Sequence, residues 1–412
     1  MSAGSAAPAG AAGPAGSVPS RVLPLLLALG LAAALGLAFI TVAPNRLTTG
    51  RGVPLMDLHT ASRWAVLPPL ALMVIAACLR PGARRCWMVL AAVSMLLGAL
   101  AWTAGDAARH LALHLALQTA AQAQAAGTVA TARFSLGAAF WCLMLLAWLA
   151  AVDALQRLGL VPWRRAAAHL ALWLPAIVLL LLGRLDELSI LKEWAQREDV
   201  FGDALARHLQ IVAAALVPAL LLGLPLAVMA VRHARFGRVV LALLGIVQTV
   251  PAIALFALLI APLAALGALW PGSGIQGVGL APALVALVVY ALLPIVASVA
   301  AALKQIEPGV IEAATGMGLG RARRLWQVEL PLALPSLFSA LRVAAVQLVG
   351  LAVVAALIGA GGLGSLIFQG LAGSALDLVL LGVVPVVVMA VVLDALLGTL
   401  AAASQRKAGG RP

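Results

Sequence analysis

The chain has 412 residues, of which 64% are hydrophobic and only 10% are charged, and its mean hydropathy is +1.10. Soluble chains contain roughly a quarter charged residues, so 27 Lys and Arg with 14 Asp and Glu exclude a soluble enzyme or a soluble nucleic-acid-binding domain. We expect an all-α integral membrane protein without a nucleic-acid partner, in which the net charge of +13 reports topology. The three cysteines form no Cys-x-x-Cys pair and predict neither a disulfide framework nor a zinc site.

About ten transmembrane helices are expected, because ten apolar runs approach or exceed the roughly 17 to 25 residues that cross a bilayer. In chain order these runs lie at residues 22–43, 64–79, 86–105, 134–155, 166–183, 209–231, 239–270, 280–303, 337–358 and 378–400. The second run is short. The seventh is overlong and contains Gly245, Pro251 and Pro262, which predict a break or kink inside it.

Basic residues set the orientation of these spans. With the N-terminus in the cytoplasm, most Lys and Arg fall in cytoplasmic loops, whereas acids offset the bases of the outer loops, so both chain ends are expected to be cytoplasmic. Residues 1–20 contain only Met, Ala, Gly, Pro, Ser and one Val and predict a disordered cytoplasmic tail, and residues 404–412 form a second tail. A cleaved signal peptide beginning at Arg21 is the competing interpretation, but its apolar stretch exceeds the usual length of about 7 to 15 residues.

The chain divides into two membrane regions. Residues 21–184 hold five of the expected spans and no motif that assigns a function. Residues 185–208 mix many charges with Leu, Ile and Trp, which predicts an extracytoplasmic interfacial helix lying along the membrane surface. The second membrane region covers residues 209–403, and we place the domain boundary at the charged segment between them.

The most informative segment is the cytoplasmic loop between the eighth and ninth spans, residues 304–331. Pro308 suits the first turn of a short helix. That helix would carry a stripe of four apolar residues at helical spacing, namely Val310, Ile311, Ala314 and Met317. After it, Gly318 and Gly320 would permit a sharp reversal with positive φ.

A second short helix is then expected from Arg321, ending at Pro331. The resulting helix-turn-helix projects an apolar stripe that cannot reach the bilayer core, so it could dock in a groove of a soluble partner. It could equally bind anionic lipid headgroups through Arg321, Arg323 and Arg324. The residues alone leave both interpretations open.

This loop also carries a family resemblance. It resembles the EAA loop of permease subunits in bacterial ATP-binding-cassette (ABC) importers, through Glu312, Ala313, Ala314, Gly318, Val328, Leu330 and Pro331. Residues 248–251 (QTVP), 290–295 (YALLPI) and 358–364 (IGAGGLG) resemble the glycine betaine, choline and proline branch of that class. The resemblance covers residues 205–400, and the layout is similar to longer members with an extra hydrophobic N-terminal region. Residues 296–298 depart from the branch, which often has a basic residue followed by Asn and Thr there.

The resemblance implies a five-helix type I ABC importer core in residues 209–403, in a bacterial inner membrane. It implies ATP-driven import of a compatible solute such as glycine betaine, choline or proline by alternating access, coupled to an ATPase through the EAA loop. The implied partners are an ABC ATPase dimer, a second permease that is the same or a different chain, an extracytoplasmic solute-binding protein and membrane lipid. The chain has only three lysines, Lys192, Lys304 and Lys407, and none stands in the Gly-Lys-Ser or Gly-Lys-Thr end of a P-loop. We therefore expect a non-enzyme without cofactors, whose partner hydrolyses ATP.

Several polar residues of the second region are expected to line a fairly bland translocation path. They are Gln248, Thr249, Pro251, Tyr290, Ser298 and Gln347. Three charged residues also fall within spans, Asp153, Arg342 and Asp394. For these we expect ion pairs or side chains that reach the cytoplasmic surface more often than solute contacts.

Two further patterns have competing interpretations. Gly359, Gly361 and Gly364 spell the dinucleotide-binding G-x-G-x-x-G, but they follow a membrane span, which favours a tight, re-entrant outer segment with close backbone packing. Asp106, His110 and His114 share one helix face at i, i+4 and i+8 and could ligate a metal, yet a solvated face is the commoner meaning, and no metal is expected.

The sequence gives little support to two other functional classes, a secondary transporter and a membrane enzyme. A secondary transporter driven by an ion gradient would need a relay of intramembrane carboxylates and usually internal repeats, whereas this chain has two membrane acids far apart in sequence. A membrane enzyme would need a convergent set of nucleophile, base and metal ligands, which the sequence lacks.

Overall fold

The computed structural model describes residues 28, 30–32, 36–45, 50–121 and 132–408. Within them, eight helices are long and apolar enough to cross a membrane, or nine when one bent pair counts as a single span. These nine match the second to tenth expected spans. The predicted tail at 1–20 and residues 22–27, 29 and 33–35 of the first expected span lie outside the described residues.

A three-stranded antiparallel sheet lies in the N-terminal region, in the order β2–β1–β3. Its strands are β1 (Ala38–Ala43), β2 (Arg51–Pro54) and β3 (Arg133–Leu136), and Ile40 of β1 faces Val53 on one side and Leu136 on the other. The prediction that residues 22–43 form one helix is therefore wrong for its last six residues. The alternation of large and β-branched residues in β1 suits a pleated strand once partners supply its hydrogen bonds.

The helices of this region form a compact bundle beside the sheet. They are α2 (Leu67–Cys78), α3 (Ala83–Ala121), α5 (Ala138–Arg157), α6 (Pro162–Leu172) and α7 (Leu174–Leu181), preceded by 3₁₀ turns at Leu55–Asp57 and Ala61–Val66. Large side chains from the sheet and from α2, α3 and α5 share one buried cluster. The fifth expected span is the pair α6 and α7, bent by 47° at Trp173, where Pro175 begins the second helix.

The second region begins with α8 (Ser189–Gln196) and α9 (Glu198–Arg232). The segment expected as one interfacial helix at 185–208 is therefore divided between α8 and the first turns of α9. The helices α10 (Ala234–Thr249), α11 (Ala252–Leu269), α12 (Leu280–Lys304), α13 (Pro308–Gly316), α14 (Arg321–Arg324), α15 (Leu330–Ala355), α16 (Leu363–Ala372) and α17 (Leu376–Ala408) follow. Short turns lie at Pro271–Ser273, Leu325–Glu329 and Ala356–Ile358. Because α17 continues to Ala408, the tail predicted from residue 404 is helical up to that residue.

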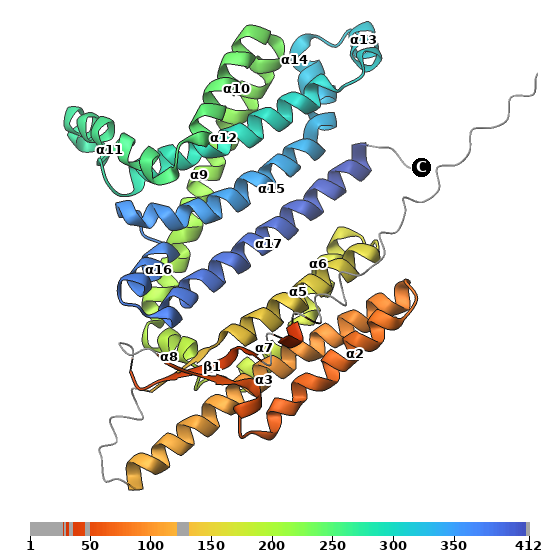
Figure 1. Ribbon diagram of the computed structural model, residues 1–412. Coiled ribbons are helices and arrows are strands. Elements are labelled where there is room, and N and C mark those ends of the chain that lie inside the picture. The colour runs from red at the N-terminus through yellow and green to blue at the C-terminus, as the bar shows by residue number, and fades with distance from the viewer. Residues whose placement is uncertain (1–27, 29, 33–35, 46–49, 122–131, 409–412) are drawn as a thin grey trace, which may run out of the picture.

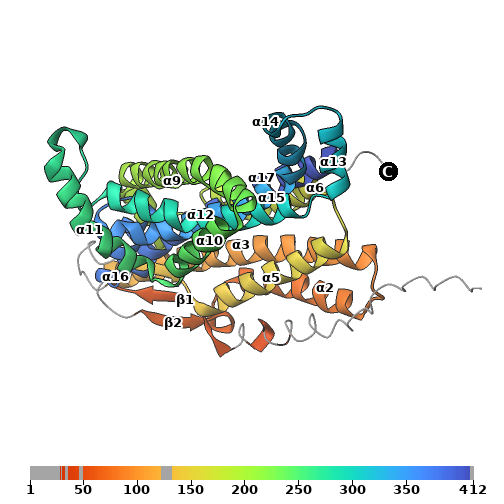
Figure 2. The same cartoon turned by 90° about the horizontal axis from the view of Figure 1, so that it is seen from above.

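The long helices α9, α12, α15 and α17 run side by side and pack around a second buried cluster (Figure 1). The short helices α13 and α14 lie at one end of this bundle, whereas α8, α16 and the sheet lie at the other (Figure 1). Figure 2 shows α11 projecting from the bundle on the side away from α13. Only 6% of the residues of α11 are buried inside the protein.

The two regions meet through α17 and through the end of the bundle that bears α8 and α16. Arg133 of β3 pairs with Glu193 of α8 at 3.1 Å, and Glu193 is 1% exposed. The hydroxyl of Ser135 donates to Asp377 at the start of α17 at 2.7 Å. Polar side chains therefore join the N-terminal sheet to the second region, in addition to the apolar contact of α6 with α17.

Candidate functional site

The loop between α12 and α15 begins with α13, which has Pro308 in its first turn as predicted. Of its apolar stripe, Ala314 is buried against the protein, while Met317 is 74% exposed at the helix end. Gly318 adopts φ +80°, so the prediction of a positive φ is confirmed there. It is wrong for Gly320, which is extended at φ −66° and ψ 161° and caps α14.

The loop continues into the membrane without a break. Residues Arg321–Ile358 form one helical rod of 38 residues, so the prediction of a separate helix ending at Pro331 is wrong. A π-helical turn at Leu325–Glu329 explains the difference, since Leu330 donates its N–H to Leu325 five residues back. Pro331 then stands in the first turn of α15, where a missing N–H is tolerated. The turn therefore carries the helix past the proline.

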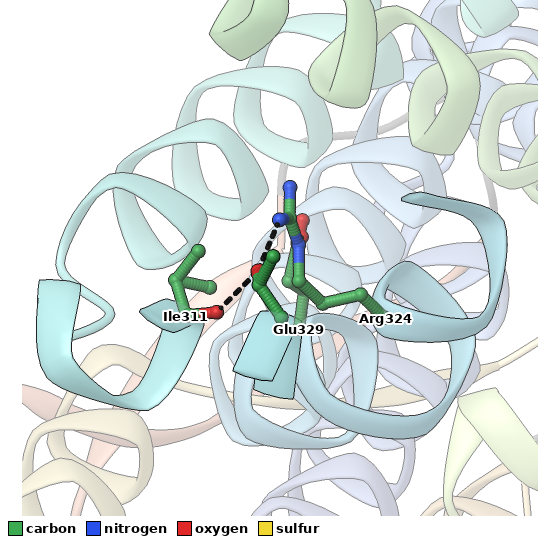
Figure 3. Close-up of polar contacts among 4 residues, drawn as sticks. Ile311, Arg324 and Glu329 are labelled. Atoms are coloured by element: carbon green, nitrogen blue, oxygen red, sulfur yellow. Dashed lines mark hydrogen bonds and ion pairs between the residues drawn. The ribbon is translucent and has the colours of Figure 1, made fainter. Parts of the chain in front are cut away.

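Arg324 ties α13 to this rod. Its Nε donates to Oε1 of Glu329 at 2.8 Å, across the π turn, and its Nη1 donates to Oγ1 of Thr315 in α13 at 3.1 Å. The Thr315 hydroxyl in turn donates to the carbonyl of Ile311 at 2.7 Å (Figure 3). The three-residue chain Thr315, Arg324 and Glu329, which we call the loop clamp, was not predicted.

A second polar group lies at the break in the seventh span. Pro251 ends α10 and starts α11, which confirms the predicted break and leaves carbonyls at the end of α10 without helical partners. The hydroxyl of Tyr290, from α12, donates to the carbonyl of Val250. Gln248 donates to the Tyr290 carbonyl at 2.7 Å and accepts from Gln347 of α15 at 3.3 Å. Three helices are thereby joined at the break.

The structure thus brings together Gln248, Tyr290 and Gln347 of the six residues predicted for a translocation path. Thr249 is exposed and donates only to the carbonyl of Ile246 in its own helix. Ser298 lies two turns along α12 from Tyr290 and is half-buried. Pro251 lies at the break itself, where its ring fixes the backbone angle φ and removes a hydrogen-bond donor.

The glycine-rich segment after α15 forms a tight turn, as predicted. Gly359, Gly361 and Gly362 adopt φ near +80°, and a Cβ on Gly364 would meet the Val353 carbonyl at 2.1 Å. The segment leads into α16, which packs back on α15 and α17.

Two residues of α9, missed in the sequence, hold the glycine turn. Arg207 donates to the Ala360 carbonyl at 3.1 Å, and the fully buried ring of His208 contacts the Val349 carbonyl at 3.1 Å. They are the last two residues of the predicted interfacial segment 185–208, which gave no signal of contacts some 150 residues along the chain.

The charged residues within the spans form ion pairs. Arg342 of α15 makes a bidentate pair with Asp394 of α17, one contact being 2.6 Å from Nη2 to Oδ2, and Arg157 pairs with Asp153 at 2.8 Å. The expectation of ion pairing is confirmed for both. Asp106, His110 and His114 lie along α3, and among the described residues no three His, Cys, Asp or Glu side chains are grouped to hold a metal ion.

Comparison with known families decides what this arrangement belongs to. Residues 19–191 match the family described as ABC transporter permease YehY, N-terminal domain, and residues 219–408 match the binding-protein-dependent transport system inner membrane component. The osmoprotectant import permease protein OsmW of Salmonella typhimurium is 40% identical over 46% of this chain and 85% of its own length. The chain belongs to the osmoprotectant branch of the ABC importer permeases. The family resemblance drawn from the loop is therefore confirmed.

Other relatives of this ABC permease match the same half of the chain. The carnitine transport permease protein OpuCB of Listeria monocytogenes is 32% identical over 47% of this chain and 83% of its own length. A chain of the MetNI methionine ABC transporter, solved in inward facing conformations, is 25% identical with a TM-score of 0.46, covering 51% of this chain and 99% of that one. Family membership makes the chain a multi-pass inner-membrane permease of a transport system, not an enzyme, and decides against the secondary transporter that the sequence had been compared with.

Proposed function

We propose that this permease imports a compatible solute such as glycine betaine, choline or proline by alternating access. Its relatives are named for osmoprotectant and carnitine transport. The observation that carries the mechanism is the continuous rod Arg321–Ile358, which is separated from α13 by four residues and runs into the membrane-spanning bundle. Movement at the start of this rod would be transmitted into α15, which packs against α12 and α17.

The ATPase contact in this proposal is the EAA loop at residues 304–331. The motif positions lie on α13, in the turn after it and near the start of the rod; they are Glu312, Ala313, Ala314, Gly318, Val328, Leu330 and Pro331. Met317 and Val310 leave an apolar surface uncovered, which suits a groove of a soluble nucleotide-binding subunit. Closure of an ATPase dimer on ATP would move two such loops, one from each permease of a pair, the second permease being the same or a different chain.

The orientation follows from charge. The end of the molecule that bears α13 also holds the start of α3 and the ends of α5 and α17 (Figure 1), where Arg84, Arg85 and Arg157 lie. By the positive-inside rule we infer that this end, where α17 finishes, is cytoplasmic, and that the sheet, α8 and α16 lie outside, where a solute-binding protein would deliver its cargo.

The division of labour follows the two buried clusters. The cluster of residues 204–389 belongs to the proposed translocation core at 209–403, and the cluster of residues 39–188 belongs to a peripheral unit at 21–184. The segment at 185–208 joins them. In the core, the group of Gln248, Tyr290 and Gln347 stands beside the proposed path, with Thr249, Pro251 and Ser298 further along it.

The test is reconstitution of the permease with its ATPase and binding protein in vesicles of bacterial phospholipid. ATP-dependent uptake of labelled glycine betaine, choline and proline is measured for the natural chain, Met317→Asp and the control Met317→Leu. The aspartate variant should lose the ATPase from the purified complex, because it places a charge in an apolar contact, and Met317→Leu should retain it. Retention of the ATPase and full uptake by Met317→Asp would contradict the assignment of α13 as the contact.

A further inference from the structure

Backbone hydrogen bonds close the C-terminal end of α13, from the Gly318 N–H to the Thr315 carbonyl at 3.0 Å and from the Leu319 N–H to the Ala314 carbonyl at 3.1 Å, and the loop clamp adds a side-chain link from α13 to the rod. Only residues 317–320 connect them, and two of these four are glycines with open space around the Cα atom. Glycine backbones have the widest conformational freedom, so this connection alone would act as a hinge. A hinge there would let α13 move without moving α15.

The side chain of Arg324 restrains this hinge. Its guanidinium reaches Thr315 with one nitrogen and Glu329 with another, so a single planar group holds α13 and both sides of the π turn in one geometry. The side chains of Arg324 and Glu329 are only 22% and 14% exposed, and partial burial strengthens a charge-assisted hydrogen bond relative to a surface ion pair.

The neighbouring arginines differ from Arg324 in this respect. Arg321 and Arg323 are exposed, and within the described part of the chain no hydrogen bond or ion pair is recorded for either side chain. Charge alone would make the three arginines equivalent, as expected for a surface that binds lipid headgroups. Geometry distinguishes Arg324 from the other two.

We propose that Arg324 is a positioning residue that locks α13 to the rod Arg321–Ile358 through Thr315 and Glu329, so that movement of the ATPase contact is converted into movement of the transmembrane helix. The inference rests on the proposed function of α13. It assigns Arg324 an effect on coupling between ATP hydrolysis and transport, distinct from any effect on binding of the ATPase.

Thr315 offers a test with matched variants in the assembled complex. Thr315→Val keeps the shape of the side chain but removes the hydroxyl that joins Arg324 to α13, whereas Thr315→Ser keeps the hydroxyl. In Thr315→Val we expect amide exchange in residues 310–316 to become roughly tenfold faster, as for the loss of a hydrogen bond to a charged group. Thr315→Ser should exchange at a rate close to that of the natural chain.

The functional measurement is solute imported per ATP hydrolysed. Thr315→Val and Arg324→Lys should lower this ratio severalfold, because lysine cannot bridge two acceptors in the fork geometry. Arg323→Lys makes the same substitution one residue away, outside the clamp, and should leave the ratio unchanged. All three variants should still co-purify with the ATPase, since the apolar face of α13 is intact.

The outcomes separate the two proposals. An unchanged ratio and unchanged exchange in Thr315→Val would overturn the clamp while leaving α13 as the ATPase contact. An equal loss in Arg323→Lys and Arg324→Lys would also overturn it, in favour of a general need for arginine on this loop. If Met317→Asp retains the ATPase and full uptake, the proposed function fails, whatever the clamp variants show.

Discussion

Gly318→Val tests the turn of the proposed coupling loop most directly. Gly318 has φ +80°, a conformation in which a side chain at Cβ crowds the backbone. No other atom lies within 4 Å of a Cβ built there, so the cost comes from the backbone and not from a steric clash with neighbours. A non-glycine residue in this region costs about 1 to 2 kcal/mol, and a β-branched residue stands at the upper end of that range. The population of the observed turn should fall by a factor of roughly 5 to 30 relative to other loop conformations.

Gly320→Val is the matched control. Gly320 also has open space around its Cα, but at φ −66° and ψ 161° valine is accommodated without strain. In the assembled importer, solute-stimulated ATP hydrolysis and uptake are measured for both variants. Gly318→Val should uncouple hydrolysis from uptake, while Gly320→Val should behave like the natural chain.

The result that would refute this reasoning is equal behaviour of the two variants. Unchanged coupling in Gly318→Val would show that the left-handed turn is not needed for the loop to act. Equal damage by both variants would show that bulk at the surface, and not backbone conformation, governs the contact with the ATPase.

Three further predictions concern the rest of the molecule. Asp394→Leu should destabilise the purified permease by on the order of 3 kcal/mol, because the charge of Arg342 remains in a membrane-spanning helix, and adding Arg342→Met should recover most of that loss in thermal unfolding. Glu193→Gln should cost about 3 to 5 kcal/mol, because it leaves Arg133 without its carboxylate partner at a buried joint, and proteolysis should then separate the two membrane regions. Labelled glycine betaine should bind the purified permease no more tightly than roughly millimolar, since Tyr290 is 3% exposed and offers no open ring face for a cation.

Each of these predictions has a control or a result that would contradict it. Glu187→Gln breaks an exposed pair with Lys192 and should cost less than about 1 kcal/mol, so an equal effect of Glu187→Gln and Glu193→Gln would contradict the importance of the buried joint. An additive loss in the double variant of Arg342 and Asp394 would show that the two charges do not act as a pair. Micromolar binding of glycine betaine without the binding protein would show that the permease itself has a high-affinity site.

The features that sequence predicted well are those set by local chemistry. Pro251 lacks a backbone N–H to donate, and the break in the seventh span lies at that residue, whereas Pro262 of the same span lies inside α11. Gly318 was expected to take a positive φ because the chain must reverse after α13, and it does. The family could also be recognised from the sequence, because its loop motif is a local pattern of residue types.

The features that sequence missed depend on partners distant in the chain. Residues Ala38–Ala43 are as apolar as a membrane helix, and they form a strand by pairing with β2 and with β3, which lies some 90 residues later. Pro331 indicated a helix end, but the π turn before it depends on where the hydrogen bonds shift, which composition does not encode. Hydropathy therefore located the spans but could not give the sheet or the length of the rod.

The length of the rod has a mechanical consequence. At 1.5 Å per residue, the 38 residues of Arg321–Ile358 extend about 57 Å, from the turn after α13 to the glycine segment at Gly359. A tilt of about 5° around its middle would move the two ends in opposite directions by on the order of 2 Å each. At the outer end, Gly359 and Gly361 allow the backbone to change direction, and Arg207 fixes the turn to α9. Movement of the cytoplasmic loop would therefore reach the outer surface of the permease directly, as alternating access requires.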